Sequence, residues 1–255
     1  MSEPSSPPRR PPIRALFFDI DDTLCATSEF ARQARVAGVD AMCRAGLCLD
    51  REEAIQELFE VVREFSSNYG SHYDKLLARI PSAAYVGINP AILVAAAVAA
   101  YHDTKHKSLV AYEDVLDVLT RLRTVEGLTL GVITAGLTIK QAEKIWRLGI
   151  YPYLDPRAIF ISDQIGISKP NAKLFLRACQ DIGVPPAAAM YVGDHPTHDI
   201  APAIQTGMVA VHMKRAGEHH DKPYEVEPHH IVHNFWDLLE LLETHYDLGA
   251  AAPRA

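Results

Sequence analysis

Five short apolar segments, separated by segments of helical periodicity, constrain the fold of this chain more than any other feature of its sequence. The first, residues 13–20 (IRALFFDI), is apolar at nearly every position, which is typical of a central parallel strand covered on both faces. Similar segments follow at residues 128–134, 158–162, 189–194 and 208–213. Strands that alternate with helices in this way predict an α/β fold with a doubly wound, mostly parallel, Rossmann-like sheet.

The alternation is interrupted once, between Leu24 and about Ala111, where helical signals run throughout. Asp50 followed by Glu53 has the pattern of a helix-capping box, and Asn89 before a proline marks another helix start. We therefore expect an all-helical cap domain inserted after the first strand. Ligands of open α/β sheets bind at the carboxyl ends of the strands, so this domain would hang over the ligand-binding edge.

These patterns divide the chain into a core, a cap and two tails. The predicted core consists of residues 13–24 and 109–247, and the predicted cap of residues 25–108. Residues 1–12, MSEPSSPPRRPP, are rich in Pro and Ser and lack the apolar segment of a signal peptide, so we expect a flexible tail there. Residues 248–255 are expected to form a second flexible tail at the other end of the sequence. No membrane partner is expected, because the apolar run AILVAAAVAAY in the cap has about half the length of a membrane-spanning helix. We expect that run to form a buried helix face.

Charge and cysteine content limit the partners and the compartment. The 255 residues include 25 basic and 32 acidic side chains, which give a net charge of -7, and no basic cluster lies on a predicted element. Nucleic acid is therefore not expected as a partner. The four cysteines are far apart and form no CxxC pair, so we expect a cytoplasmic protein without a zinc site or disulfides. Cys43 and Cys48 are predicted to be buried in helices.

Acidic side chains stand where two predicted strands end. Asp19 and Asp21 follow the first strand, and Asp194 and Asp199 follow the strand near residue 190. A single pair of carboxylates is commonly a turn or helix cap, but the carboxyl ends of parallel strands meet at one edge, where these residues would gather. Like charges this close repel, and a hard divalent cation with oxygen ligands relieves the repulsion. The sequence therefore predicts Mg²⁺ as the cofactor.

Polar residues at other strand ends favour a phosphoryl site. Magnesium usually completes its coordination with water and a substrate phosphate rather than with protein ligands alone. Lys169 and the hydroxyl of Thr134 could contact the phosphoryl oxygens, and backbone amides near Asp21 and Ala135 could add donors. Taken singly, Thr134 could equally cap a turn, and Lys169 could be a solvated loop residue.

The motifs DIDDT, VITAG, SKP and GDHPTHD occur in this order, with a helical insertion after the first. With these motifs and this insertion, the chain from about residue 13 to about residue 246 resembles the haloacid dehalogenase superfamily of phosphatases with a cap of the first type. The resemblance implies that Asp19 attacks phosphorus to form an aspartyl-phosphate and that Asp21 is the general acid and base. It also implies that Thr134 and Lys169 bind phosphate.

The same resemblance implies a metal site. The magnesium ligands would be Asp19, the backbone carbonyl of Asp21, and Asp194. Asp199 would lie behind these ligands in the second shell, or would contact the ion through a water molecule. The cap segments ARQARVAGVDAMCRAGL and REFSSNYGSHYDKLL are similar to a group of magnesium-dependent phosphatases known mainly from archaea, some of which act on glyceraldehyde 3-phosphate. That group suggests homodimers, for which the apolar cap helix offers a surface.

We therefore expect a magnesium-dependent phosphomonoester hydrolase that acts on a small phosphorylated metabolite such as a sugar or triose phosphate. A dehalogenase or phosphonate hydrolase is disfavoured, because the resembling enzymes of those kinds lack a carboxylate where Asp21 stands. A phosphomutase and a non-catalytic phospho-ligand sensor of the same fold stay open as alternatives. His195 and His198 are interpreted as loop residues, since an oxygen-rich site favours magnesium over a transition metal, and residues 217–230 as a solvated His-rich loop.

Overall fold

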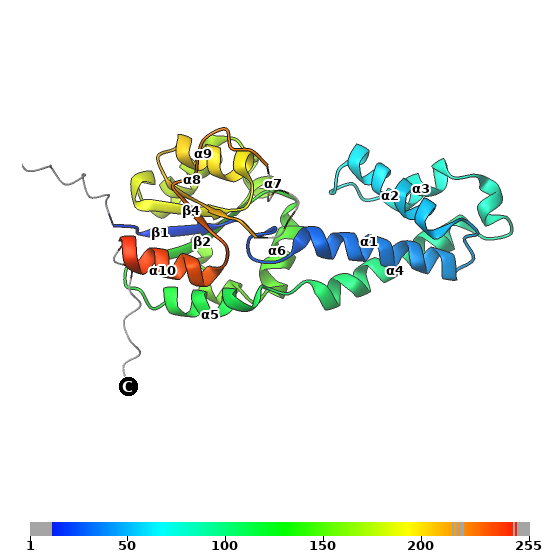
Figure 1. Ribbon diagram of the computed structural model, residues 1–255, viewed down its shortest axis with the longest axis horizontal. Helices are drawn as coiled ribbons and strands as arrows, with labels where there is room; N and C mark the ends of the chain where they lie inside the picture. Colours follow the sequence, from blue (N-terminus) through cyan, green and yellow to red (C-terminus); the bar gives the residue numbers. More distant parts are fainter. Residues whose placement is uncertain (1–11, 216, 218, 220–221, 247, 249–255) are drawn as a thin grey trace, which may run out of the picture. The chain divides into compact units, whose positions relative to one another are not determined.

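The computed structural model describes residues 12–215, 217, 219, 222–246 and 248, and these form two compact units (Figure 1). The core unit lies within residues 1–26 and 111–255, and the helical unit comprises residues 27–110. The predicted cap of residues 25–108 differs from the helical unit by two residues at each end. Apart from Pro12 and Leu248, the predicted tails lie outside the described residues.

In the described part of the core unit, six parallel strands form one sheet in the order β3-β2-β1-β4-β5-β6. The strands are β1 (Ala15–Phe18), β2 (Thr129–Thr134), β3 (Ile159–Ile161), β4 (Ala189–Gly193), β5 (Val209–Met213) and β6 (His230–Val232). The predicted α/β class and the five predicted strands are confirmed. Strand β6 was not predicted, because its three residues are too few to give a periodic signal.

Helices cover both faces of the sheet, α8 and α9 on one side and α5 and α10 on the other (Figure 1). The helices of this unit are α5 (Glu113–Leu122), α6 (Thr138–Arg147), α7 (Ser162–Ile165), α8 (Ala172–Ile182), α9 (Ala201–Gln205) and α10 (Phe235–Tyr246). Short turns of helix are η2 (Tyr151–Tyr153), η3 (Pro156–Ala158), η4 (Pro186–Ala188) and η5 (Pro196–Ile200). None of the described helices combines the length and the apolar character needed to cross a membrane.

The continuous hydrophobicity of β1 follows from its central position. All four of its residues are buried. The Phe17 ring packs edge-on against Phe160 at a centroid distance of 6.0 Å, and the Phe18 ring lies 5.6 Å from Phe235 of α10. Successive side chains of a strand point to opposite faces, so both faces of β1 need apolar residues.

The helical unit contains α1 (Thr27–Arg44), α2 (Arg51–Phe65), α3 (His72–Arg79), η1 (Ser82–Tyr85) and α4 (Pro90–Ser108). It has its own apolar core, in which Met42, Leu58, Leu76 and Leu93 are buried. The predicted caps are present: Asp50 accepts from the amide of Glu53 and Asn89 from that of Ala91, both at 3.0 Å. In the core unit, Asn171 and Gly183 likewise cap the two ends of α8.

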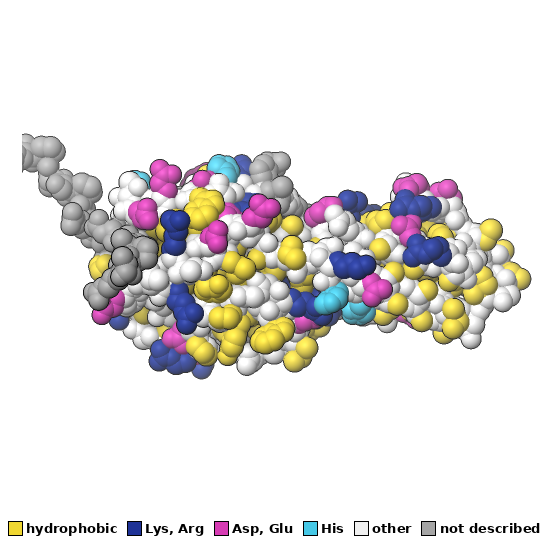
Figure 2. Space-filling model, turned by 90° about the horizontal axis from the view of Figure 1, so that it is seen from below, with side chains coloured by type: hydrophobic (Ala, Val, Ile, Leu, Met, Phe, Trp, Pro, Cys, Tyr) yellow, Lys and Arg dark blue, Asp and Glu magenta, His cyan; other side chains and the backbone are white. Residues whose placement is uncertain are grey.

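Two expectations about burial in the helical unit are wrong. Of the apolar run at residues 91–101, Leu93 and Ala97 are buried, whereas Ile92 and Val98 are 58% and 39% exposed. In Figure 2, hydrophobic side chains accordingly lie among charged ones on the surface of this unit. Cys48 is exposed in a loop, because α1 ends at Arg44, and Cys43 is half-buried. Apolar composition alone does not say which side of a helix has a neighbour.

We predict that Gly131→Ala destabilises the core unit. A Cβ at position 131 would lie 2.4 Å from the carbonyl oxygen of Ala158 and 2.9 Å from the Phe17 ring, and neither neighbour can move freely. Overpacking of this kind costs about 1–3 kcal/mol of unfolding free energy, which urea denaturation would measure. At Gly70 an added Cβ meets nothing within 4 Å, so Gly70→Ala is the control and should change stability by less than about 0.5 kcal/mol. Equal stability of the two variants would contradict the prediction.

Candidate active site

Two neighbouring strands place Asp19 and Asp194 at one edge of the sheet. Strands β1 and β4 are paired in parallel, with Phe18 opposite Val192, and the amide of Asp19 donates to the carbonyl of Val192 at 2.9 Å. Asp19 directly follows β1 and Asp194 directly follows β4. Their exposed fractions are 5% and 8%, so both carboxyl groups are largely removed from water.

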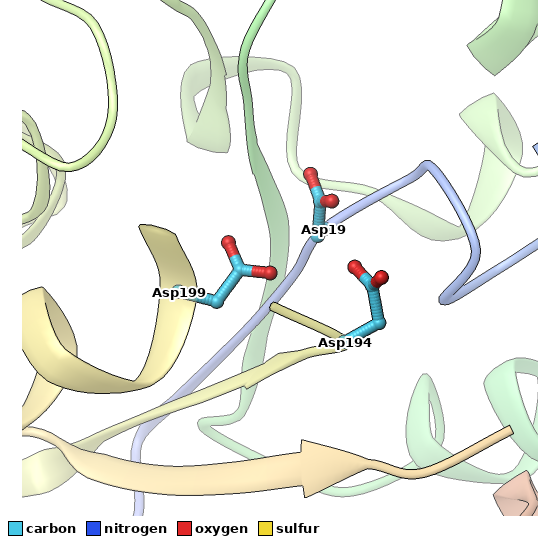
Figure 3. Close-up of side chains that lie close together, drawn as sticks. All are labelled: Asp19, Asp194 and Asp199. Carbon is cyan, nitrogen blue, oxygen red and sulfur yellow. The ribbon is translucent and has the colours of Figure 1, made fainter. Parts of the chain in front are cut away.

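Asp199 completes a group of three carboxylates. One oxygen each from Asp19, Asp194 and Asp199 lies within 4.8 Å of the others. Figure 3 shows the three carboxylates converging from the end of β1, the end of β4 and the turn η5. The sequence predicted that Asp19, Asp21, Asp194 and Asp199 gather at one edge of the sheet. The structure brings the carboxylates of Asp19, Asp194 and Asp199 together, whereas that of Asp21 is not part of this group.

Lys169 supplies a positive charge to this cluster. Its Nζ lies 2.8 Å from Asp19 Oδ1 and 2.6 Å from Asp199 Oδ1, and its side chain is 5% exposed. Burial lowers the pKa of Lys169, but the attraction of Asp19 and Asp199 outweighs burial and raises the pKa above its usual value. The ammonium group is therefore charged at every physiological pH.

Asp199 is held by protein donors on both of its oxygens. Oδ1 accepts from Lys169 and lies 3.0 Å from the hydroxyl of Tyr191, and Oδ2 accepts from the amide of His195 at 3.0 Å. A Cβ on Gly193 would lie 2.5 Å from Oδ2, so glycine is needed at that position. These contacts favour a role for Asp199 in orienting Lys169 over direct metal ligation.

Three buried carboxyl groups share the ammonium group of Lys169, an arrangement that opposes the ionisation of Asp19 and Asp194. Burial, followed by repulsion from Asp199 and Asp19, raises the pKa of Asp194 to about 9. Burial also raises the pKa of Asp19 to about 7, against the opposing effect of Lys169. Carboxylate oxygens are the ligands that a hard divalent cation binds, and the charge of the cation favours the ionised form of such buried carboxyl groups. The residues present therefore fit a divalent metal site.

Thr134 and Ala135 lie at the end of β2, beside β1. The Thr134 side chain is buried, and its hydroxyl donates to Gln141 Oε1 at 3.3 Å. The carbonyl of Ala135 accepts from Gln141 Nε2 at 3.0 Å. Gln141 therefore sets the conformation of the loop that follows β2.

The side chain of Asp21 contacts two residues of α6 that sequence reasoning missed. Lys144 Nζ lies 2.5 Å from Asp21 Oδ1, and Gln141 Nε2 lies 3.3 Å from Asp21 Oδ2. Tyr191, in the middle of β4, was also missed. The signal that could have found Gln141 and Lys144 is their spacing of three residues on a helix that starts just after VITAG.

The histidines near the cluster have a structural role. Nδ1 of His195 accepts from the amides of Thr197 and His198, each at 3.2 Å, and thereby caps η5. The His195 ring stacks on His198 at 4.2 Å. Burial, then His219 and His198, lower the pKa of His195 to about 4. Among the described residues, the group able to hold a metal consists of Asp side chains.

Comparison with known proteins agrees with this arrangement. Residues 13–207 match the family of haloacid dehalogenase-like hydrolases. The chain is similar to a glyceraldehyde 3-phosphate phosphatase of Methanopyrus kandleri, with 46% identity over 212 residues that cover 82% of this chain and 87% of the relative. A glyceraldehyde 3-phosphate phosphatase of Methanocaldococcus jannaschii is 34% identical over 231 residues, 91% of this chain and 97% of the relative.

A solved structure of a 2-haloacid dehalogenase from Pseudomonas syringae pv. Tomato has a similar fold, with a TM-score of 0.61 and 26% identity. The likeness covers 91% of this chain and 98% of the dehalogenase chain.

We predict that the metal-free protein loses stability as the pH rises from 5 to 9. In the folded protein Asp19 and Asp194 have pKa values of about 7 and about 9, whereas the ordinary value is 3.8. The folded state therefore holds protons that the unfolded state has released, and stability falls as pH passes through the folded pKa values. Thermal unfolding in EDTA would measure this. Asp194→Asn should flatten the profile above pH 7, and a profile that rises between pH 7 and 9 would contradict the prediction.

Proposed function

The chain belongs to the haloacid dehalogenase-like hydrolase family, and we propose that it is a magnesium-dependent phosphatase of small phosphorylated metabolites. The observation that carries the proposal is the buried cluster of Asp19, Asp194 and Asp199 around Lys169 at the carboxyl ends of β1 and β4. The relatives named as glyceraldehyde 3-phosphate phosphatases support a triose phosphate as the first substrate to test, and sugar phosphates as the next.

In the first step, a carboxylate oxygen of Asp19 attacks phosphorus. A bond forms between that oxygen and phosphorus, the ester P–O bond breaks, and its electron pair stays on the leaving oxygen. The carboxyl group of Asp21 gives its proton to that oxygen, so an alcohol leaves and an aspartyl-phosphate remains. Lys169, 2.8 Å from Asp19 Oδ1, orients the nucleophile and stabilises the charge on the phosphoryl oxygens.

In the second step, the carboxylate of Asp21 accepts a proton from water while the water oxygen attacks phosphorus. The bond between phosphorus and the Asp19 oxygen breaks, which releases inorganic phosphate and restores the Asp19 carboxylate. Asp21 is protonated again and ready for the next ester. Thr134 and the amide of Ala135, at the end of β2, are the proposed donors to the phosphoryl group.

The carboxylates of Asp19 and Asp194 and the backbone carbonyl of Asp21 are the proposed ligands of Mg²⁺. A cation held there would supply positive charge that offsets the negative charge of the carboxylates and of the phosphoryl group. Asp199 contributes indirectly, by holding Lys169 through a contact of 2.6 Å.

Three further assignments belong to this proposal. Residues 25–108 serve as the cap that limits access of water during transfer. The exposed apolar side chains of α4, which include Ile92 and Val98, support a homodimer. All four cysteines lie among the described residues and form no disulfide there, which supports a reducing, cytoplasmic location.

We predict that the protein releases phosphate from glyceraldehyde 3-phosphate in the presence of Mg²⁺, and that EDTA abolishes the reaction. Asp19→Asn removes the nucleophile and should lower kcat by at least about 10³-fold. The matched control is Asp181→Asn, which removes a carboxylate paired with Arg177 on the exposed side of α8 and should leave kcat unchanged. A colorimetric phosphate assay over a panel of phosphorylated metabolites measures all of these rates.

Other outcomes of that panel would contradict the proposal. An Asp19→Asn variant with wild-type activity would exclude the aspartyl-phosphate. Thermal stabilisation by a phosphorylated ligand without release of phosphate would favour a sensor. Isomerisation of a sugar phosphate that is activated by the corresponding bisphosphate would favour a phosphomutase.

A further inference from the structure

One face of α6 lies against the side chain of Asp21. Gln141 and Lys144 are three residues apart, so they project from the same side of this helix. The opposite side of α6 is open to solvent, since Ile139 and Trp146 are 79% and 75% exposed. Two polar side chains of α6, Gln141 and Lys144, are thus turned inward on the same side as the buried Ile145.

Lys144 makes the shorter of the two contacts. Its Nζ lies 2.5 Å from Asp21 Oδ1, and its side chain is 12% exposed, compared with 33% for Asp21. A lysine so far removed from water needs a charged partner, because an unpaired buried ammonium is strongly destabilising. This contact therefore differs from the exposed pairs of the same helix, such as Arg147 with Glu143.

Gln141 connects Asp21 to the loop after β2. The Gln141 side chain is almost fully buried, with an exposed fraction of 4%. Its Nε2 group is 3.0 Å from the carbonyl of Ala135 and 3.3 Å from Asp21 Oδ2, and its Oε1 accepts from the hydroxyl of Thr134. One amide group thus orients both Asp21 and the two proposed phosphate-binding residues.

Gly136, in the loop after β2, leaves room for the side chain of Gln141. Gly136 has a φ of +141°, and a Cβ at this position would lie 2.6 Å from Gln141 Nε2. The amide of Gly136 donates to the hydroxyl of Ser162 at 2.9 Å, which fixes the loop from its other side. The position of Gln141 therefore depends on several neighbours and is well defined.

On the basis of the function proposed above, we propose that Gln141 and Lys144 are positioning residues that hold both carboxyl oxygens of Asp21 where proton transfer to the leaving group takes place. They act through Asp21 and need no contact with the substrate. Proton transfer depends steeply on the position of the acid, so a misplacement of about 1 Å can cost about 10²-fold in rate. α6 in this way joins the acid and base residue to the phosphate-binding loop.

This role can be separated from a merely structural one by the leaving group of the substrate. An alkyl phosphate such as glycerol phosphate must receive a proton as its ester bond breaks, whereas a nitrophenyl phosphate leaves as a stable anion and depends little on the acid. Loss of acid positioning therefore lowers kcat/KM more for the alkyl than for the aryl ester. General disruption of the site lowers both by the same factor.

The test compares kcat/KM for glycerol phosphate and nitrophenyl phosphate, with Mg²⁺ present. For Lys144→Met we expect a loss of about 10- to 100-fold on glycerol phosphate and a loss of less than about 5-fold on nitrophenyl phosphate. Gln141→Leu also removes the contacts of Gln141 with Thr134 and Ala135, so it should lower both rates, with a loss on glycerol phosphate that is at least about 5-fold greater than the loss on nitrophenyl phosphate. Asp21→Asn should show the same preference with a larger loss. Lys144→Arg, which keeps the charge, should recover part of the activity on glycerol phosphate.

Two controls accompany these variants. Lys173→Met removes an exposed lysine of α8 and should leave both rates unchanged. Thermal unfolding midpoints show whether each variant is folded, and Lys144→Gln replaces Lys144→Met if the latter is not.

Equal losses on the two esters for Lys144→Met and Gln141→Leu, or no loss on either, would overturn the positioning role while the wild type and Asp21→Asn behave as expected. A wild-type protein that releases no phosphate from these two esters, from glyceraldehyde 3-phosphate or from the rest of the metabolite panel would overturn the proposed function itself, and an Asp21→Asn variant without a leaving-group preference would overturn the proposed role of Asp21. These failures are therefore distinguishable.

Discussion

The contact of a buried lysine with two buried carboxylates is the interaction on which the rest of the site depends. Lys169 lies between Asp19 and Asp199, and each of the three side chains would be costly to bury alone. The hydroxyl of Tyr191 and the amide of His195 then hold Asp199 in place, and Gly193 leaves room for its carboxylate. Asp194, whose pKa burial raises to about 9, is the carboxyl group whose ionised form a divalent cation would stabilise most.

Sheet order explains why this cluster can form at all. The pairing of β1 with β4 on one side and β2 on the other brings three strand ends together, although they are far apart in the chain. Each strand contributes one chemical function at its carboxyl end: a carboxylate from β1, a second carboxylate from β4, and a hydroxyl with a polar loop from β2. The apolar interior of the sheet supplies the rigidity, since Phe17 and Phe18 pack on opposite faces.

Helix α6 adds a second level of organisation. Its inward polar face, formed by Gln141 and Lys144, meets the loop after β1 and the loop after β2 at the same time. In the function proposed above, Asp21 has to stay close to the ester oxygen in both chemical steps. Contacts from one helix hold it more precisely than contacts from separate loops would.

The sequence alone determined the features that are encoded within a few neighbouring residues. The apolar runs located five strands, Asn89 and Asp50 located helix starts, and the placement of Asp19 and Asp194 after strands indicated that they would meet. The tertiary structure decided the short strand β6, the exposure of Ile92 and Cys48, and the partners of Asp21. Lys144 and Asp21 are 123 positions apart, so their contact depends on how α6 packs against the first loop. The spacing of Gln141 and Lys144 indicates a shared side of the helix, but it does not say which loop that side faces.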